Sequence, residues 1–275
     1  MSSTFLERWP RPSVMGIVNV TPDSFSDGGA YRSAAEAATA AQAMLDAGAA
    51  LVDVGGESTR PNAEPVSQDE ELRRVLSVLE LLPGRPLSVD TSRAEVARRA
   101  VAVGAAMVND VSALRREPEL AEVVAETGVD VCLMHMRGIP RTMQDDPRYD
   151  DVVSDVASFL EERIAFAIEA GIAEDRICVD PGIGFGKTPH HNLELLRRLD
   201  RIVSLGRPVL VGVSRKSTLA RVLGEQGVVG SDAASVGAAV AAFDRGATVL
   251  RVHDVRPHVE ALAAAAAVER GSIVA

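Results

Sequence analysis

The chain is poor in aromatic residues and cysteines, and it has no long apolar run. Aromatic side chains make up 3% of its 275 residues, so no stacking platform for single-stranded nucleic acid is visible. Its 2 cysteines, Cys132 and Cys178, lie in short apolar runs, where we expect reduced core thiols rather than a disulfide or a metal site. No stretch reaches the roughly 20 apolar residues of a membrane span, and the polar segment from Met1 to Pro12 does not resemble a secretory signal. These absences favour a cytoplasmic protein that does not enter membranes.

An excess of positive charge is also absent. The formal net charge is −10, which argues against binding to a nucleic-acid backbone. It leaves room for a small anion held by local Lys and Arg side chains. The composition, with 47% apolar and 25% charged residues, is that of an ordinary globular protein. A chain of this length can bury one large core, so we expect a single domain over residues 1–275, with its core at about 13–260.

Short apolar runs recur along the chain, and a polar residue follows nearly every one of them. Such runs are typical of buried parallel strands. We expect eight strands, near residues 14–19, 51–55, 86–90, 106–109, 130–135, 176–180, 208–213 and 248–252. With helices between them, these runs predict an α/β protein of the TIM (β/α)8 barrel class whose active site lies on one rim.

A doubly wound open sheet is the competing fold. It is disfavoured because no glycine-rich fingerprint follows the first apolar run. Ser33, Ser67 and Ser92 each precede a glutamate by three residues, which predicts a capping box at the start of three helices. Three connections, at 20–32, 56–66 and 136–148, are longer than a barrel needs, and all three would overhang the same rim.

The first two long connections begin with unusual motifs. Residues 19–29 read NVTPDSFSDGG, which is either a polar turn cluster or a lid. In the second case Asn19 would stand fixed at the strand end, where its amide oxygen suits Mg²⁺. Residues 55–61 read GGESTRP, in which two glycines permit close approach and the hydroxyls and guanidinium suit a phosphate. A solvated loop with an ordinary arginine is the alternative.

Residues 180–188 read DPGIGFGKT and nearly match a nucleotide-binding P-loop. The match fails because Pro181 stands where that motif needs a glycine. We favour another interpretation, in which Asp180 ends a strand, the glycines clear the space above it and Phe185 covers a ligand.

Asp90, Asn109 and Asp180 end three different predicted strands. Carboxylates that converge on one barrel mouth can accept paired hydrogen bonds from a flat heterocycle with several N–H donors. Helix capping is the alternative for any one of these residues, but it explains three of them poorly.

Cationic residues follow the last two predicted strands. Lys216 lies after the seventh run, and Arg251 and His253 end the eighth, where many barrels bind phosphate. Lys216 could instead be a solvated lysine at a helix start, and His253 a core histidine.

Taken together, these motifs resemble those of the dihydropteroate synthases. The resemblance is carried by residues 19–29, 55–61, 180–187, 214–216 and 251–254, and it extends roughly from Ser13 to Val259. It implies a transferase that condenses 6-hydroxymethyl-7,8-dihydropterin pyrophosphate with 4-aminobenzoate. The expected products are 7,8-dihydropteroate and pyrophosphate, with Mg²⁺ as cofactor and an SN1-like path.

The resemblance also implies roles for individual residues. The expected catalytic residues are Asp180, Lys216, Arg251 and His253. The pterin would meet Asp90, Asn109, Asp180 and Lys216, with Met134, Phe185 and Gly212 packed around its ring. Asn19 would meet the magnesium-bound pyrophosphate, together with Thr59, Arg251 and His253. The 4-aminobenzoate would lie among Phe25, Arg60, Pro61, Ser214 and Lys216.

Two residues depart from the family pattern. Asn62 follows Arg60-Pro61 where the family usually has glycine, and asparagine is the next most tolerant residue of a left-handed backbone. Val213 stands where alanine is common, and its two additional methyl groups predict altered sulfonamide binding.

Two other functions fit parts of the pattern. A methyltetrahydrofolate:corrinoid methyltransferase would share the pterin contacts but would not need the pyrophosphate residues. A pterin-binding copy without activity would be expected to have lost loop or anion-site residues, and none is missing. The resemblance further implies a homodimer formed through outer helices, and it gives no role to His135 or Glu57.

Overall fold

The computed structural model describes residues 3–20, 33–58, 64–224 and 230–272. In these residues, parallel strands form one 8-stranded sheet in the order β6-β5-β4-β3-β2-β1-β8-β7. The strands are β1 (Ser13–Asn19), β2 (Leu51–Gly55), β3 (Leu87–Asp90), β4 (Met107–Asp110), β5 (Asp130–Met134), β6 (Ile177–Asp180), β7 (Leu210–Val211) and β8 (Val249–Val252). β1 pairs with both β2 and β8, so the first and last strands are neighbours. The predicted barrel is confirmed, and the open doubly wound sheet is excluded.

The barrel closes between β6 and β7. An isolated parallel bridge joins Val179 to Val209, and β7 then pairs with β8. The strand predicted at 208–213 is shorter in the structure, because the chain leaves the sheet after Val211 on its way to the rim.

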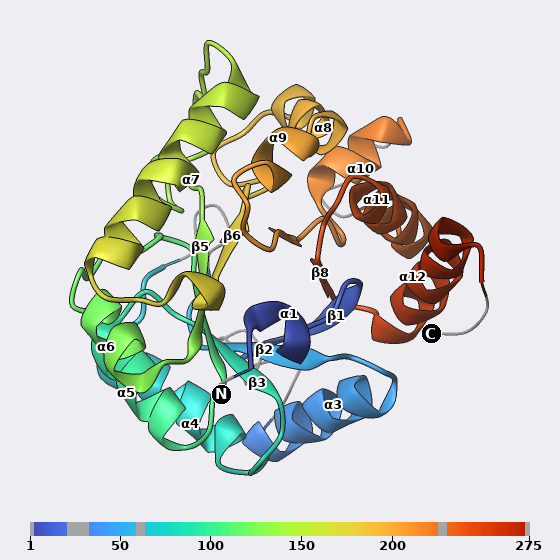
Figure 1. The fold of residues 1–275 in the computed structure, drawn as a ribbon. Coiled ribbons are helices and arrows are strands. Elements are labelled where there is room, and N and C mark those ends of the chain that lie inside the picture. The colour runs from blue at the N-terminus through green and yellow to red at the C-terminus, as the bar shows by residue number, and fades with distance from the viewer. Residues whose placement is uncertain (1–2, 21–32, 59–63, 225–229, 273–275) are drawn as a thin grey trace.

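Helices cover the outside of the barrel (Figure 1). They are α3 (Ala34–Asp46), α4 (Gln68–Leu79), α5 (Ala94–Ala102), α6 (Leu120–Thr127), α7 (Val152–Glu169), the 3-10 helix η1 (Glu174–Arg176), α8 (Pro189–Arg197), α9 (Asp200–Val203), α10 (Ser217–Val222), α11 (Asp232–Asp244) and α12 (Val255–Arg270). In the described parts of the chain, no helix combines the length and apolar character needed to cross a membrane.

The N-terminal helix α1 (Phe5–Arg8) closes one end of the barrel and lies across its opening in Figure 1. Phe5 and Trp9 pack against the apolar residues inside the barrel, which include Met15 and both cysteines. The Trp9 indole donates a hydrogen bond of 2.7 Å to Asp130, the first residue of β5. Because α1 covers the end where strands begin, the opposite end, where strands finish, remains for a site.

Of the three predicted capping boxes, two are confirmed as serine N-caps. The hydroxyls of Ser33 and Ser67 accept the backbone N–H groups of Glu36 and Glu70. The cap predicted at Ser92 is wrong, because α5 begins two residues later and the Ser92 hydroxyl donates instead to buried Asp110.

Candidate active site at the carboxyl ends of the strands

Arg251 of β8 joins acidic side chains from β2 and β3 at the barrel mouth. Its Nε donates to Asp53 Oδ2 at 2.7 Å, and its Nη2 donates to Asp90 Oδ2 at 3.0 Å. Asn109 of β4 donates from Nδ2 to the same Asp53 oxygen at 2.8 Å. Three residues predicted from separate strands therefore lie together, through an aspartate that the sequence had not singled out.

Burial changes how the carboxylates of the mouth titrate. Loss of water raises the pKa of Asp90 to about 7, with neighbouring Asp53 acting in the same direction and Arg251 opposing it. Loss of water likewise raises the pKa of Asp180 to about 6, opposed by the Gly182 N–H and by Lys216. The mouth therefore favours ligands that present N–H donors or positive charge, because its carboxylates can pair with them.

Asp180 is held by the loop that follows it. Its Oδ1 accepts the backbone N–H of Gly182 at 2.6 Å. Gly182 has a φ of 67°, and a Cβ there would lie 1.9 Å from the carbonyl oxygen of His135. Only glycine fits this position, so the glycines after Asp180 let the loop lie against the end of β5.

Lys216 and Phe185 lie together beside this loop. The Lys216 ammonium is 4.4 Å from the centre of the Phe185 ring, a cation–π distance. Phe185 also packs against a cluster of three methionines, among them Met134 at the end of β5. Lys216 directly precedes α10, and this arrangement gives the mouth an apolar wall with one cation on it.

Ser214 and His253 connect the ends of β7 and β8. The Ser214 oxygen lies 3.0 Å from His253 Nδ1 and accepts the His253 backbone N–H at 3.2 Å. His253 is therefore held on the rim, as predicted. The Gly212 backbone lies beside Arg251, whose Cβ would be an ordinary 3.9 Å from a Cβ at position 212.

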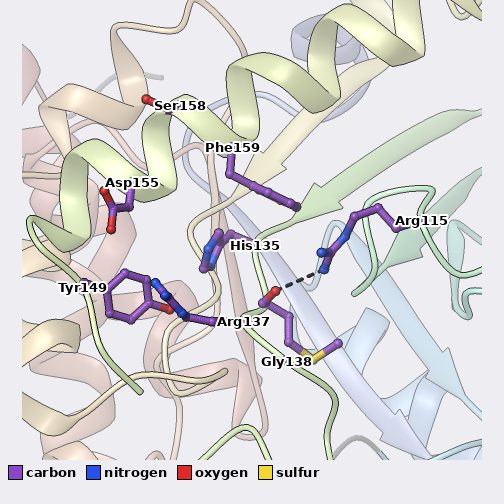
Figure 2. A pocket seen from close by; sticks show the side chains of 9 residues that line it. Arg115, His135, Arg137, Gly138, Tyr149, Asp155, Ser158 and Phe159 are labelled. Carbon is purple, nitrogen blue, oxygen red and sulfur yellow. Dashed lines mark hydrogen bonds between the residues drawn. The ribbon is translucent and has the colours of Figure 1, made fainter. Parts of the chain in front are cut away.

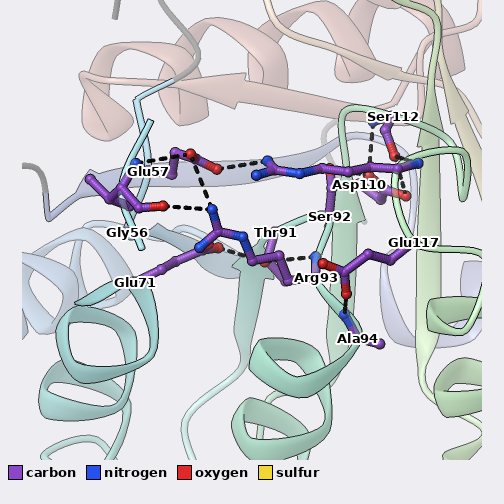
Figure 3. Close-up of polar contacts among 12 residues, drawn as sticks. Gly56, Glu57, Glu71, Thr91, Ser92, Arg93, Ala94, Asp110, Ser112 and Glu117 are labelled. Carbon is purple, nitrogen blue, oxygen red and sulfur yellow. Dashed lines mark hydrogen bonds and ion pairs between the residues drawn. The ribbon is translucent and has the colours of Figure 1, made fainter. Parts of the chain in front are cut away.

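The two ends of the second long connection are tied together by charged side chains (Figure 3). Glu57 accepts the backbone N–H of Val66 at 3.2 Å and an N–H of Arg116 at 2.8 Å. Arg93 donates to the Val66 carbonyl at 2.6 Å and pairs with buried Glu71 at 2.9 Å. Glu57 thus supports the second connection.

Lys187 is buried and has a complete set of acceptors. Its ammonium donates to His135 Nδ1 at 2.8 Å, to the Gly182 carbonyl at 2.9 Å and to the Phe185 carbonyl at 3.0 Å. Burial lowers the pKa of Lys187 to about 7, and burial together with this lysine keeps the pKa of His135 far below its usual value. The pair fastens the loop after Asp180 to the end of β5.

The other side of His135 faces a cavity of about 430 Å³ (Figure 2). Arg115, Arg137 and Tyr149 also line it. The His135 ring meets Phe159 of α7 edge-on, with ring centres 4.9 Å apart. His135 therefore packs between the loop after Asp180 and α7.

Asn19 ends β1 and pairs in register with Gly55. Its Oδ1 lies 3.5 Å from the point that a Cβ on Gly55 would occupy, and Asp90 borders the same point. The predicted contacts Phe25, Thr59, Arg60 and Pro61, and the departure at Asn62, lie outside the described residues.

One residue of the site, Asp53, was missed in the sequence, and the pairing of Lys187 with His135 was not predicted. Asp53 lies inside an apolar run rather than at its end, so the pattern predicted only a strand there. Lys187 belongs to a quoted motif and His135 ends a strand, but nothing in the sequence pairs them. A charged residue within an otherwise apolar buried run is the signal that could have identified Asp53.

Comparison with known proteins identifies the family to which the chain belongs. A family model described as pterin binding enzyme matches residues 15–253. The chain is 49% identical to dihydropteroate synthase of Escherichia coli K12 over 254 residues, which cover 91% of this chain and 89% of that protein.

Solved structures agree in fold as well as in sequence. A Xanthomonas albilineans dihydropteroate synthase with 4-aminobenzoic acid is 49% identical, with a TM-score of 0.86 and coverage of 95% of this chain and 94% of that one. A Yersinia pestis dihydropteroate synthase in a sulfonamide drug complex is 46% identical, with a TM-score of 0.87 and coverage of 94% and 95%. With its predicted strand-end residues gathered at one mouth, the chain belongs to the dihydropteroate synthase family of pterin-binding enzymes and is a transferase.

Proposed function

We propose that the chain condenses 6-hydroxymethyl-7,8-dihydropterin pyrophosphate with 4-aminobenzoate, giving 7,8-dihydropteroate and pyrophosphate. The observation that carries this proposal is the group of Asp90, Asn109 and Asp180 around Arg251, next to Lys216. A methyltransferase of the same barrel class would have no use for the cationic rim at Lys216 and His253.

The pterin is recognised by hydrogen bonds to buried carboxylates. Its guanidine-like edge offers parallel N–H donors, and a carboxylate can accept two of them at once. Asp180 is 6% exposed, so such bonds form away from competing water. Met134 and Phe185, which already pack in one cluster, cover the faces of the ring.

The pyrophosphate lies toward the rim, near Asn19 and His253. The amide oxygen of Asn19 is a hard neutral donor of the kind that suits Mg²⁺, and it stands at a strand end where glycine leaves room. Asn19 would hold the magnesium ion there, with the pyrophosphate oxygens as further ligands. When bound, this ion neutralises the charge that builds on the leaving group. Thr59, Arg251 and His253 are the remaining predicted contacts.

The chemistry needs charge stabilisation more than proton transfer. The bond between the pterin methylene and the pyrophosphate oxygen breaks first, and the electron pair leaves with pyrophosphate. The electron-rich pterin spreads the resulting positive charge, and Asp180 stabilises it electrostatically. The neutral amino group of 4-aminobenzoate then forms the C–N bond and loses a proton to water. No strong general base is required, and the path is SN1-like.

4-Aminobenzoate binds above the pterin. Lys216 and Ser214 border this region, and Phe25, Arg60 and Pro61 are its other predicted contacts. The Lys216 ammonium lies 4.4 Å from the centre of the Phe185 ring, which supports its proposed role as a contact to both substrates.

Pyrophosphate release tests the proposal directly. The purified protein is assayed with the pterin pyrophosphate, Mg²⁺ and 4-aminobenzoate, and each is omitted in turn. We expect stoichiometric release of pyrophosphate and 7,8-dihydropteroate only in the complete mixture. Pterin binding without turnover would instead indicate a copy that has lost activity.

We also propose that the protein is a homodimer that forms through outer helices. Leu193 of α8 and Val222 and Leu223 at the end of α10 are apolar side chains exposed by 42%, 59% and 51%. α8 and α10 contact each other, so these side chains belong to neighbouring elements. Light scattering should give twice the 29.0 kDa mass of one chain, and the single mass would contradict the proposal.

A further inference from the structure

Asp53 is fully buried in β2, beneath the residues assigned to the pterin. One of its oxygens, Oδ2, accepts both Arg251 Nε at 2.7 Å and Asn109 Nδ2 at 2.8 Å. In the described part of the chain, its other oxygen, Oδ1, is buried without a hydrogen-bond partner. An unpaired buried carboxylate oxygen costs stability, so a side chain needed only for packing would not be expected here.

The contact with Asp53 determines which way the Asn109 amide points. A carboxylate oxygen accepts hydrogen bonds, so it attracts the NH₂ end of the amide and repels the carbonyl end. A rotated amide would bring two acceptor oxygens to about 2.8 Å of each other. Asn109 is therefore fixed with its nitrogen on Asp53, and a ligand meets its carbonyl oxygen in one orientation only.

Asp53 also fixes the arginine of the mouth. With Nε on Asp53 and Nη2 on Asp90, the planar guanidinium of Arg251 is held at two points from two strands. Asp53 thus orients two side chains that border the proposed pterin pocket.

We propose that Asp53 is a positioning residue that sets the hydrogen-bond pattern of the pterin pocket through Asn109 and Arg251. This inference rests on the proposed function, because it concerns how the same pocket selects its heterocycle. With the Asn109 amide held in this way, its oxygen faces the ligand as a hydrogen-bond acceptor. The pocket therefore selects a ring that has an N–H donor opposite this oxygen. A ring with an acceptor at that place is rejected because two acceptors would face each other.

The test compares two probes, 6-hydroxymethyl-7,8-dihydropterin and 6-hydroxymethylpterin. Both present the same guanidine-like edge to Asp180, but the first carries a hydrogen at ring N8 where the second has an acceptor. Their dissociation constants are measured by calorimetry for the wild type, Asp53→Asn and Asp53→Leu. We expect the wild type to prefer the dihydropterin, and both variants to bind it about tenfold more weakly or worse with a smaller preference.

Ser88→Ala is the matched control. Ser88 pairs in register with Asp53 on the next strand, and its hydroxyl is likewise buried without a partner among the described residues. This control should keep both the affinity and the preference. The melting temperatures and the KM for 4-aminobenzoate should change little in Asp53→Asn. A folded Asp53→Asn variant that keeps the wild-type preference overturns the inference, whereas a wild type that binds no pterin overturns the proposed function instead.

A second measurement needs no change at Asp53. The side-chain NH₂ signal of Asn109 is identified by NMR from its loss in Asn109→Leu. We expect one of its hydrogens to exchange slowly with water, and to stay so when 6-hydroxymethyl-7,8-dihydropterin binds. Rapid exchange of both hydrogens in the free and bound enzyme would show that Asp53 does not hold the amide, and would also overturn the inference.

Discussion

Single residues of the mouth differ in behaviour because they differ in burial and in neighbours. Asp180 keeps a raised pKa near 6 although a backbone N–H and Lys216 both oppose the shift. Asp90 has a second carboxylate close by, and its pKa rises further, to about 7. Two strand-end aspartates of the same type are thus set to different values by what lies beside each.

Val213 shows how burial changes an expectation drawn from sequence. Its side chain is 1% exposed and belongs to the apolar cluster that joins the strands to the surrounding helices. We therefore expect Val213→Ala to lower the free energy of unfolding by about 2 kcal/mol through lost packing. Sulfonamide inhibition should stay within about twofold of the wild type. Denaturant unfolding measures the change in stability, and an inhibition curve measures the change in sulfonamide binding. A severalfold change in inhibition would support the hypothesis that Val213 alters sulfonamide binding.

Positions at strand ends were predictable, and contacts between strands were not. The end of an apolar run marks the rim, so Asp90, Asn109 and Asp180 could be grouped from the sequence. Which aspartates Arg251 would bond depends on the register of β8 with β1, β2 and β3, and the sequence does not state that register. The leaving-group role expected for Arg251 stays a prediction, since the guanidinium pairs with two aspartates.

At the scale of elements, the loop after β6 depends on one glycine. Gly182→Ala would place a methyl group 1.9 Å from the His135 carbonyl, in a backbone conformation that L residues rarely adopt. We expect a melting temperature lower by several degrees and a loss of pterin affinity, because Asp180 bonds the Gly182 N–H. Gly206→Ala is the control. It has a similar φ of 73° with open space around it, so it should cost about 1 kcal/mol and leave affinity unchanged. Equal effects of the two changes would contradict this account.

The second connection depends on the Glu57–Arg93 network. Arg93→Met removes the bonds that reach Val66 and Glu71, at the end of the segment that carries Thr59, Arg60 and Pro61. We expect the KM for 4-aminobenzoate to rise about tenfold while the affinity for pterin changes little. Arg98→Met is a matched change on α5, the helix that Arg93 directly precedes. The lost partner there is exposed Glu126, so this change should have no effect. Steady-state kinetics with each substrate varied decides between these outcomes, and an unchanged KM would refute the link.

Element boundaries were predicted well where packing decides them and poorly where single polar contacts do. The eight strands follow from apolar runs, because burial on both sides of a parallel sheet leaves that pattern. The start of α5 could not be predicted from the pattern. Glu117, from another segment, accepts the N–H of Ala94, so the Ser92 hydroxyl is not needed as a cap and donates to Asp110.

At the scale of the whole molecule, proton binding is linked to pterin binding. In the free enzyme Asp180 and Asp90 have pKa values near 6 and 7, above their ordinary value of 3.8. The folded protein thus holds protons that the unfolded chain releases, so these groups lower its stability as pH rises from about 4 to about 7. A pterin that donates to the carboxylates favours their ionised form.

We therefore expect pterin affinity to increase from about pH 5 to about pH 7 and then to level off. Calorimetry in two buffers of different ionisation enthalpy should show proton release near pH 6.5, to which Asp90 and Asp180 contribute. Asp90→Asn should leave only the lower transition, near pH 6. Affinity that falls as pH rises across this range would mean that the protonated carboxyls bind the ligand.

The most direct measurement is the rate of 7,8-dihydropteroate formation by the wild type, Asp180→Asn and Lys216→Ala, with exposed Arg98→Met as control. Removing the charge of Asp180 removes the stabilisation of the pterin cation, and removing Lys216 removes a contact to both substrates. We expect the wild type and the control to form product and pyrophosphate in equal amounts. Both site variants should lose about 100-fold or more in kcat/KM. Wild-type kcat/KM in either folded site variant would contradict the assignment of the mouth as the active site.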